Sequence, residues 1–264
     1  MPTHELQLAG KTILVTGAAR GIGLAISRAC VGNGAAVFLS DIRDDEGSRA
    51  AEAIGAAYVR LDVRSEADWT AALGSIDGIQ GLVNNAGITG FGDEGLGGQD
   101  AEHCTLEDWR AVHATNLDGV FLGCKHAIAA MKDAGGSIVS IASRSGKVGV
   151  GGAAAYASSK AAVINHTRSV ALYCAERGYA VRCNAISPGA ILTPMWEALL
   201  EHAPDRETAI AEFAAEVPLR RMGTPEDVAN LAVYLLGEQS RYVTGADFSV
   251  DGGLTAGTAA QPKK

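Results

Sequence analysis

The chain has 264 residues, of which 47% are hydrophobic, and a formal net charge of −8 at pH 7. The acidic balance argues against nucleic acid or an anionic membrane surface as a partner, because both repel a negatively charged protein. The length suffices for one substantial core, and no apolar run reaches the roughly 20 residues that a membrane-spanning helix needs.

Strand-like and helix-like segments alternate along the chain, which is the pattern of a parallel sheet with helices on both faces. Strands are predicted at residues 12–15, 36–40, 57–61, 81–84, 137–141, 180–186 and 247–250. The capping-box pattern from Thr105 to Asp108 predicts the start of a long helix that continues to Met131, and Thr224-Pro225 begins another helix. The expected fold is α/β, a single Rossmann-type doubly wound domain over residues 1–264, with flexible tails at 1–9 and 256–264.

The first predicted strand leads into a glycine-rich turn and then into an apolar-periodic helix. Gly17, Gly21 and Gly23 have the spacing Gly-x-x-x-Gly-x-Gly, and Arg20 and Ile22 flank the second glycine. Glycines permit a tight turn and let the backbone approach a pyrophosphate, whose charge is met by N–H groups at the helix N-terminus. This context predicts a dinucleotide-binding turn, although a plain connector is the alternative.

The second predicted strand leads into Asp41, at the offset where an acidic residue meets the adenosine ribose. Its carboxylate would repel a 2′-phosphate, so we expect NAD as the cofactor. Arg20 and Arg43 point toward NADP instead, but a carboxylate in direct contact with the 2′-oxygen carries more weight. Asp41 is alternatively a cap of the following helix.

Tyr156 and Lys160 are four residues apart, which places them on one face of a predicted helix, and Ser143 follows the strand before it. An ammonium beside a phenol favours the phenolate and lowers the tyrosine pKa toward the range in which it exchanges protons at neutral pH. An isolated Tyr-x-x-x-Lys match is usually a packed ring beside a solvated lysine. The dinucleotide signal upstream favours an acid/base site with Ser143 beside the reacting oxygen.

Taken in order, these motifs resemble the classical short-chain dehydrogenase/reductase family over residues 11 to 253. The resemblance rests on Thr16-Gly17-x-x-x-Gly21-Ile22-Gly23, Asn84-Asn85-Ala86-Gly87, Asn116, Ser143, Tyr156-x-x-x-Lys160 and Pro188-Gly189. It implies that Asn116 holds a water that links Lys160 to solvent, and that Lys160 and Tyr156 also contact the cofactor. It further implies cofactor contacts by Asp62, Val63, Asn85, Ala86, Gly87, Pro188, Gly189, Ile191 and Thr193.

Structural alternatives stay open for several of these residues. Asp62 would serve equally as a residue at a helix start, and Asn116 as a polar residue that kinks its helix. The Pro188-Gly189 segment is alternatively an ordinary turn. The acid- and glycine-rich stretch at 89–104 either borders the site or is a surface loop.

The resemblance implies hydride transfer between a secondary alcohol and a nicotinamide, with Tyr156 as acid and base. Residues 190–216 follow the nicotinamide turn and are expected to form a substrate lid, because Met195, Trp196 and Leu199 make an apolar strip; core packing is the equal alternative. Arg144 either favours an acidic substrate group or pairs with a surface carboxylate, and pairing is the preferred interpretation. We therefore expect a lipophilic, cyclic secondary alcohol, as for the bacterial hydroxysteroid dehydrogenases that residues 123–132 and 171–176 resemble.

Two other functions remain open, a 3-oxoacyl thioester reductase that uses NADPH and a non-catalytic dinucleotide sensor. The family also implies a homotetramer. The start of the chain lacks the pattern of a signal peptide, so the cytoplasm is expected. Five scattered cysteines and six histidines show no disulfide or metal-ligand spacing, and we expect no metal.

Overall fold

The computed structural model describes residues 7–90, 97–200 and 205–257. In this part of the chain, seven strands form one parallel sheet in the order β3-β2-β1-β4-β5-β6-β7. The strands are β1 (Thr12–Thr16), β2 (Ala36–Asp41), β3 (Ala57–Arg60), β4 (Gly81–Asn84), β5 (Gly136–Ile141), β6 (Val181–Pro188) and β7 (Asp247–Val250). All seven predicted strands are confirmed, with ends that differ by one or two residues.

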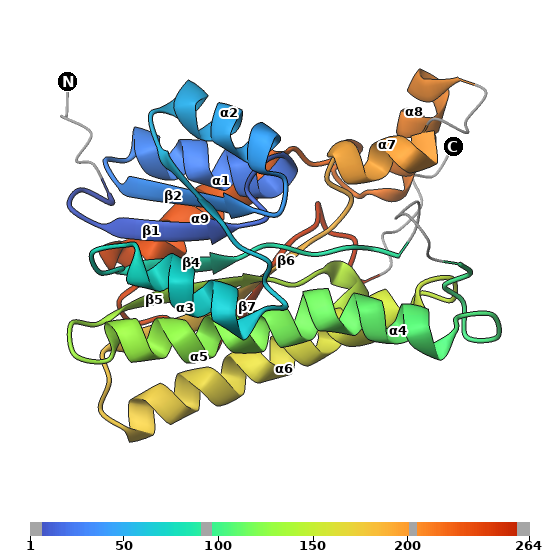
Figure 1. Cartoon of the computed structure of the whole chain (residues 1–264). Coiled ribbons are helices and arrows are strands. Elements are labelled where there is room, and N and C mark those ends of the chain that lie inside the picture. Colours follow the sequence, from blue (N-terminus) through green and yellow to red (C-terminus); the bar gives the residue numbers. More distant parts are fainter. Residues whose placement is uncertain (1–6, 91–96, 201–204, 258–264) are drawn as a thin grey trace.

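Helices cover both faces of the sheet and make a three-layered molecule (Figure 1). One face is covered by α1 (Gly21–Gly32), α2 (Asp44–Ile54) and α9 (Pro225–Leu236). The other face is covered by α3 (Glu66–Gly74), α4 (Leu106–His113), α5 (Gly119–Met131) and α6 (Ala154–Glu176). Beyond the carboxyl ends of the strands lie α7 (Pro194–Leu200) and α8 (Arg206–Glu216). The predicted doubly wound α/β fold is therefore confirmed.

The core has two parts because side chains of a strand alternate between the faces of the sheet. In β1, Ile13 and Val15 pack on the side of α1 and α9, whereas Leu14 packs on the side of α3 and α5. Leu8 is fully buried in the first of these clusters. Residues 7–9 thus belong to the folded body and not to the expected tail, while 1–6 and 258–264 lie outside the described residues.

The long helix predicted from Thr105 to Met131 is interrupted. The Thr105 hydroxyl caps α4 by accepting the Asp108 N–H at 3.0 Å, as expected. A π-helical segment, Ala114–Asp118, then separates α4 from α5. Asn116 lies inside this segment, and the alternative in which it kinks its helix stays a prediction. Such π turns are frequent at functional sites.

No helix among the described residues is both long and apolar enough to cross a membrane.

Candidate active site

A cleft with a volume of about 680 Å³ follows the carboxyl edge of the sheet. Pockets of this size hold small molecules and cofactors, and in open α/β sheets they form at the point where the strand order reverses, here between β1 and β4. Predicted site residues that line the cleft are Gly17, Arg20, Gly21, Ile22, Asp41, Asp62, Val63, Asn85, Ala86, Gly87, Ser143, Tyr156, Lys160, Pro188, Gly189, Ile191, Thr193, Met195 and Trp196.

Three predicted site residues do not line the cleft: Gly23, Asn116 and Arg144. The side chain of Leu199 lies outside the described part of the structure. Conversely, the sequence interpretation missed the lining residues Ile42, Leu61, Arg64, Ile88, Thr89, Thr115, Ile141, Ala142 and Pro194. Several of these are immediate neighbours of the predicted residues at strand ends, and that position was the signal that could have identified them.

The turn after β4 packs against the glycine-rich turn and is hydrogen-bonded to it. Gly17 has a φ of 61°, and a Cβ there would lie 2.7 Å from the Ala86 Cα. The Asn85 side-chain amide donates hydrogen bonds of 2.9 Å to the carbonyl oxygens of both Thr16 and Gly17. A Cβ at Gly23 would lie 2.4 Å from the Gly17 oxygen, so Gly23 allows α1 to pack against the turn without facing the cleft.

The N-terminus of α1 opens toward the cleft. Arg20 is its N-cap residue but supplies no side-chain cap, and the first turn contains no acidic residue. Neither the N-cap residue nor the first turn of α1 supplies an anion, and the helix dipole favours a negative group there. A pyrophosphate fits this position.

Asp41 connects the glycine-rich turn to the loop after β2. One carboxylate oxygen accepts the Ala19 N–H and the other accepts the Arg43 N–H, both at 3.1 Å. The following helix begins at Asp44 with Arg43 as its N-cap residue. The alternative in which Asp41 caps that helix is therefore wrong.

Asp62 borders the cleft but already has a cationic partner. The Arg64 guanidinium donates to both carboxylate oxygens, with distances of 2.9 Å to Oδ1 and 2.7 Å to Oδ2. These bonds lower the pKa of Asp62. Ser65 caps α3, accepting the Asp68 N–H at 3.2 Å. A cofactor base at this site would meet an Asp62–Arg64 pair and not a free carboxylate.

Ser143, Tyr156 and Lys160 meet where β5 ends against α6. Buried Ser143 accepts the Ser145 N–H on its hydroxyl oxygen at 3.1 Å, and its hydroxyl also interacts with the Tyr156 phenol. Lys160 is also buried and donates from Nζ to the Ile141 carbonyl oxygen at 2.9 Å. Its Nζ lies 5.8 Å from the centre of the Tyr156 ring.

Burial changes the titration of both groups on α6. It raises the pKa of Tyr156, against which the Ser143 hydrogen bond and the Arg144 charge act. Burial also lowers the pKa of Lys160 to about 8. Arg144 is a cation that lowers the pKa of Tyr156 in the structure, whereas the same effect of Lys160 stays a prediction. The Lys160 ammonium is bonded to Ile141.

Asn116 is fully buried beside these residues. Its amide nitrogen donates to the Ile88 carbonyl oxygen at 2.9 Å and to the Ser159 hydroxyl at 3.1 Å, while its amide oxygen accepts the Ile88 N–H at 2.9 Å. A Cβ at Gly87 would lie 3.1 Å from this oxygen and 3.3 Å from the Lys160 Nζ. Asn116 thus links the chain after β4 to α6, close to Lys160.

One part of the cleft is bordered by α7, from which Met195 and Trp196 line it. Trp196 makes an edge-to-face contact with Phe213 of α8, with ring centres 4.9 Å apart.

Among the described residues Arg144 forms no ion pair, so the preferred interpretation of pairing with a surface carboxylate is wrong. In the stretch at 89–104, Thr89 borders the cleft and buried Gln99 accepts the Ala154 N–H at the start of α6; residues 91–96 lie outside the described part.

Comparisons with known proteins agree with this geometry. The family model described as enoyl-(acyl carrier protein) reductase matches residues 17–255. The chain is 39% identical to a 3-beta-hydroxysteroid dehydrogenase of Comamonas testosteroni, with 96% of this chain and 98% of that protein covered. It belongs to the classical short-chain dehydrogenase/reductase family.

Further relatives of this short-chain dehydrogenase/reductase are similar along nearly their whole length. A 3-alpha-(or 20-beta)-hydroxysteroid dehydrogenase of Mycobacterium bovis is 41% identical over 96% of this chain and 92% of its own. An NADP-dependent (R)-specific alcohol dehydrogenase of Lentilactobacillus kefiri is 38% identical over 95% and 98%. The crystal structure of a short-chain type dehydrogenase/reductase from Mycobacterium marinum superposes with a TM-score of 0.82 at 33% identity, covering 96% of this chain and 98% of that one.

The family and these relatives identify the chain as an oxidoreductase that acts on alcohols and uses a nicotinamide dinucleotide. Its five cysteines are unpaired thiols. Among the residues that the structure describes, no group of His, Cys, Asp or Glu side chains has an arrangement that would hold a metal ion.

Proposed function

We propose that this enzyme interconverts a lipophilic, cyclic secondary alcohol and its ketone with NAD as the cofactor. The observation that carries the proposal is that one cleft joins Asp41 at its adenosine end to Ser143, Tyr156 and Lys160 at its other end. We further propose that the chain acts as one dinucleotide-binding and catalytic domain, with residues 190–216 as the lid.

In the oxidative direction, the Tyr156 phenolate takes the proton from the substrate hydroxyl. A bound nicotinamide supplies the hydride acceptor. Ser143, held by the Ser145 N–H on its oxygen and next to the Tyr156 phenol, turns its hydroxyl hydrogen to the substrate oxygen when the substrate is bound. Lys160 contributes its positive charge near the phenol and binds the nicotinamide ribose, while Asn116 holds the backbone beside it.

The preference for NAD rests on Asp41. Its carboxylate lines the cleft and is fixed by the Ala19 N–H, at the place where a ribose 2′-hydroxyl would be bound and a 2′-phosphate repelled. Arg20 is exposed and lacks an ion-pair partner among the described residues, and one relative is NADP-dependent. We give the carboxylate more weight than this arginine because we expect it to contact the 2′-oxygen directly.

The substrate class rests on the lid and the relatives. Met195 and Trp196 border the cleft, and apolar walls select apolar ligands. Two of the relatives are hydroxysteroid dehydrogenases. One alternative is reduction of a 3-oxoacyl thioester with NADPH. The family model's description also names a carrier-protein substrate, although an enoyl reductase acts on a carbon–carbon double bond and not on a 3-oxo group.

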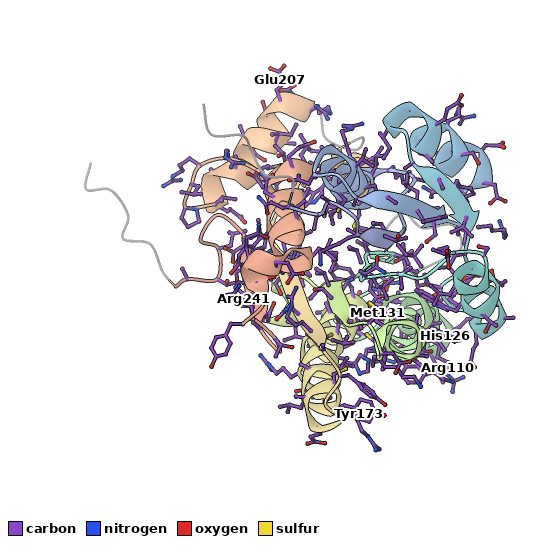
Figure 2. The ribbon with its side chains drawn as sticks, turned by 90° about the vertical axis from the view of Figure 1, so that its left-hand side faces the viewer. Arg110, His126, Met131, Tyr173, Glu207 and Arg241 are labelled. Atoms are coloured by element: carbon purple, nitrogen blue, oxygen red, sulfur yellow. The ribbon has the colours of Figure 1, made fainter. Side chains whose placement is uncertain are left out.

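We also infer a homotetramer in the cytoplasm. Phe121 of α5 and Leu172 and Tyr173 of α6 are large apolar side chains that stay exposed on the outer helical layer. Figure 2 shows Tyr173 at the end of the molecule opposite Glu207 of α8, so contacts through this layer leave the lid accessible. Light scattering that finds a stable monomer at micromolar concentration would refute the tetramer.

The test is the initial rate of nicotinamide reduction or oxidation with a substrate panel. Steroidal and cyclic secondary alcohols are offered with NAD and with NADP, and 3-oxoacyl thioesters with NADH and NADPH. We expect activity with NAD and the alcohols. Activity confined to NADPH and the thioesters would replace the proposed function with the alternative.

A further inference from the structure

The turn that carries Ser143 is short and rigidly bonded. Ser143 precedes a 3-10 turn, Arg144–Gly146, in which the Gly146 N–H bonds to the Ser143 carbonyl oxygen at 3.0 Å. The Lys147 N–H bonds to the Arg144 carbonyl oxygen at 2.9 Å. A displacement of Lys147 is therefore transmitted to Ser143 through the hydrogen bonds of a single turn.

One side of the turn rests on α6. A Cβ at Gly146 would lie 2.7 Å from the carbonyl carbon of Lys160 and 2.8 Å from the backbone nitrogen of Ala161. No residue other than glycine allows the two backbones to approach this closely without a shift. This contact fixes the distance between the turn and α6, the helix that carries Tyr156 and Lys160.

The other side of the turn is tied to β7 by Lys147. The Lys147 Nζ lies 3.1 Å from Oδ2 of Asp247 and donates to the Ser249 hydroxyl at 2.6 Å. The Asp247 side chain is only 7% exposed, and its second oxygen accepts the Ser187 hydroxyl at 2.6 Å. Ser187 is the residue of β6 directly before Pro188. One buried carboxylate therefore connects the Ser143 turn to the strand that leads into the Pro188-Gly189 turn.

We propose that Lys147 is a positioning residue that, through Asp247 and Ser187, fixes the Ser143 hydroxyl relative to the nicotinamide turn. The inference rests on the proposed function, in which Ser143 binds the reacting oxygen. A buried carboxylate holds its cation in one geometry far more strictly than an exposed one does, because loss of that partner leaves an uncompensated charge. A misplacement of about 1 Å at a reacting group costs about a hundredfold in rate.

The experiment compares kcat of Lys147→Met in the wild-type and Ser143→Ala backgrounds, with NAD and an alcohol that the wild type oxidises. We expect a loss of about tenfold in the wild-type background but less than about twofold in Ser143→Ala, because the hydroxyl that Lys147 positions is already absent. Lys147→Arg should restore most of the activity. Lys11→Met is the matched control: Lys11 pairs with Glu238 at 2.7 Å and is 19% exposed, against 24% for Lys147.

Two results would overturn the inference. An equal loss in both backgrounds would mean that Lys147 acts on the fold and not through Ser143, and unchanged kcat would mean that the turn needs no anchor. If Lys147→Met does not fold, Lys147→Met/Asp247→Asn removes both charges and should show the same dependence on Ser143. Wild-type turnover is measured first, so a failure of the proposed function is seen separately.

Discussion

Lys160 donates a hydrogen bond of 2.9 Å from its Nζ to the carbonyl oxygen of Ile141, the last residue of β5. The bond joins α6, which carries Tyr156, to the strand that leads into Ser143. The ammonium is buried at this place, and burial lowers the pKa of Lys160 to about 8.

Lys160→Met should separate stability from activity. Between pH 8 and 10.5 the unfolded chain binds more protons at Lys160 than the folded chain does, so the wild-type free energy of unfolding rises with pH. The variant lacks this dependence. We compare the free energies of unfolding of the wild type and the variant, measured with denaturant at pH 8 and at pH 10.5. From the lower to the higher pH, the wild type should gain up to about 3 kcal/mol relative to the variant, whereas the variant is inactive at both. A difference that does not change with pH would contradict the burial of this charge.

Arg144→Ala should move the pH profile of oxidation toward higher pH. The phenolate of Tyr156 is the active form in that direction, so kcat/KM rises as pH passes its pKa, and the Arg144 charge lowers this pKa. Without Arg144 we expect the rise to shift upward by up to about one pH unit, and Arg144→Lys to retain most of the wild-type profile. Arg110→Ala, on the outer helical layer in Figure 2, is the control.

The same variant tests whether the substrate is uncharged. Arg144 is half-buried and has no ion-pair partner among the described residues, so it can attract an acidic group. For an uncharged alcohol, we expect the rate at saturating pH to be nearly unchanged. A loss confined to alcohols that carry a carboxylate would refute the uncharged substrate and assign Arg144 to its recognition.

Asp41→Asn should weaken the discrimination between NAD and NADP. Removal of the carboxylate charge ends the repulsion of a 2′-phosphate while the amide still bonds the Ala19 region. We expect the ratio of kcat/KM for NAD to that for NADP to fall by about tenfold or more. Asp45→Asn, in the exposed first turn of α2, should leave the ratio unchanged. If the ratio for Asp41→Asn does not change, Arg20 or Arg43 and not Asp41 determines the preference between NAD and NADP.

Asn85→Ala should loosen the glycine-rich turn. The carbonyl oxygens of Thr16 and Gly17 lose their amide donor, at a cost of about 1–3 kcal/mol in unfolding free energy. We expect the KM for NAD to rise several-fold more than the KM for the alcohol, measured by initial rates at a saturating level of the second substrate. Asn165→Ala, exposed on α6, serves as the control.

Residues at strand ends could be predicted from the sequence because their chemistry is local. Gly17 and Asp41 follow directly from a strand pattern and a turn, and the parallel sheet then gathers such ends along one edge. The same local rule gave the Thr105 and Thr224 helix starts. Both signals depend on a few neighbouring residues.

Pairings between distant residues could not be predicted this way. Lys147 and Asp247 are 100 positions apart and meet only because β7 is the last strand of the sheet beside β6. The π-helical segment around Asn116 and the partner of Lys160 likewise depend on packing between elements. The environment of a titratable group follows from the fold, which is why the effect of the Arg144 charge on Tyr156 was not predicted.

The most direct test of the account is the NAD-dependent oxidation rate of Tyr156→Phe beside that of Tyr242→Phe, whose ring is fully exposed. The measurement is the initial rate with the best alcohol of the panel, with NADH binding checked by fluorescence. The account predicts that Tyr156→Phe binds NADH but loses at least about a hundredfold in kcat, while Tyr242→Phe matches the wild type. A Tyr156→Phe enzyme that retains wild-type turnover would contradict the assignment of Tyr156 as the acid and base.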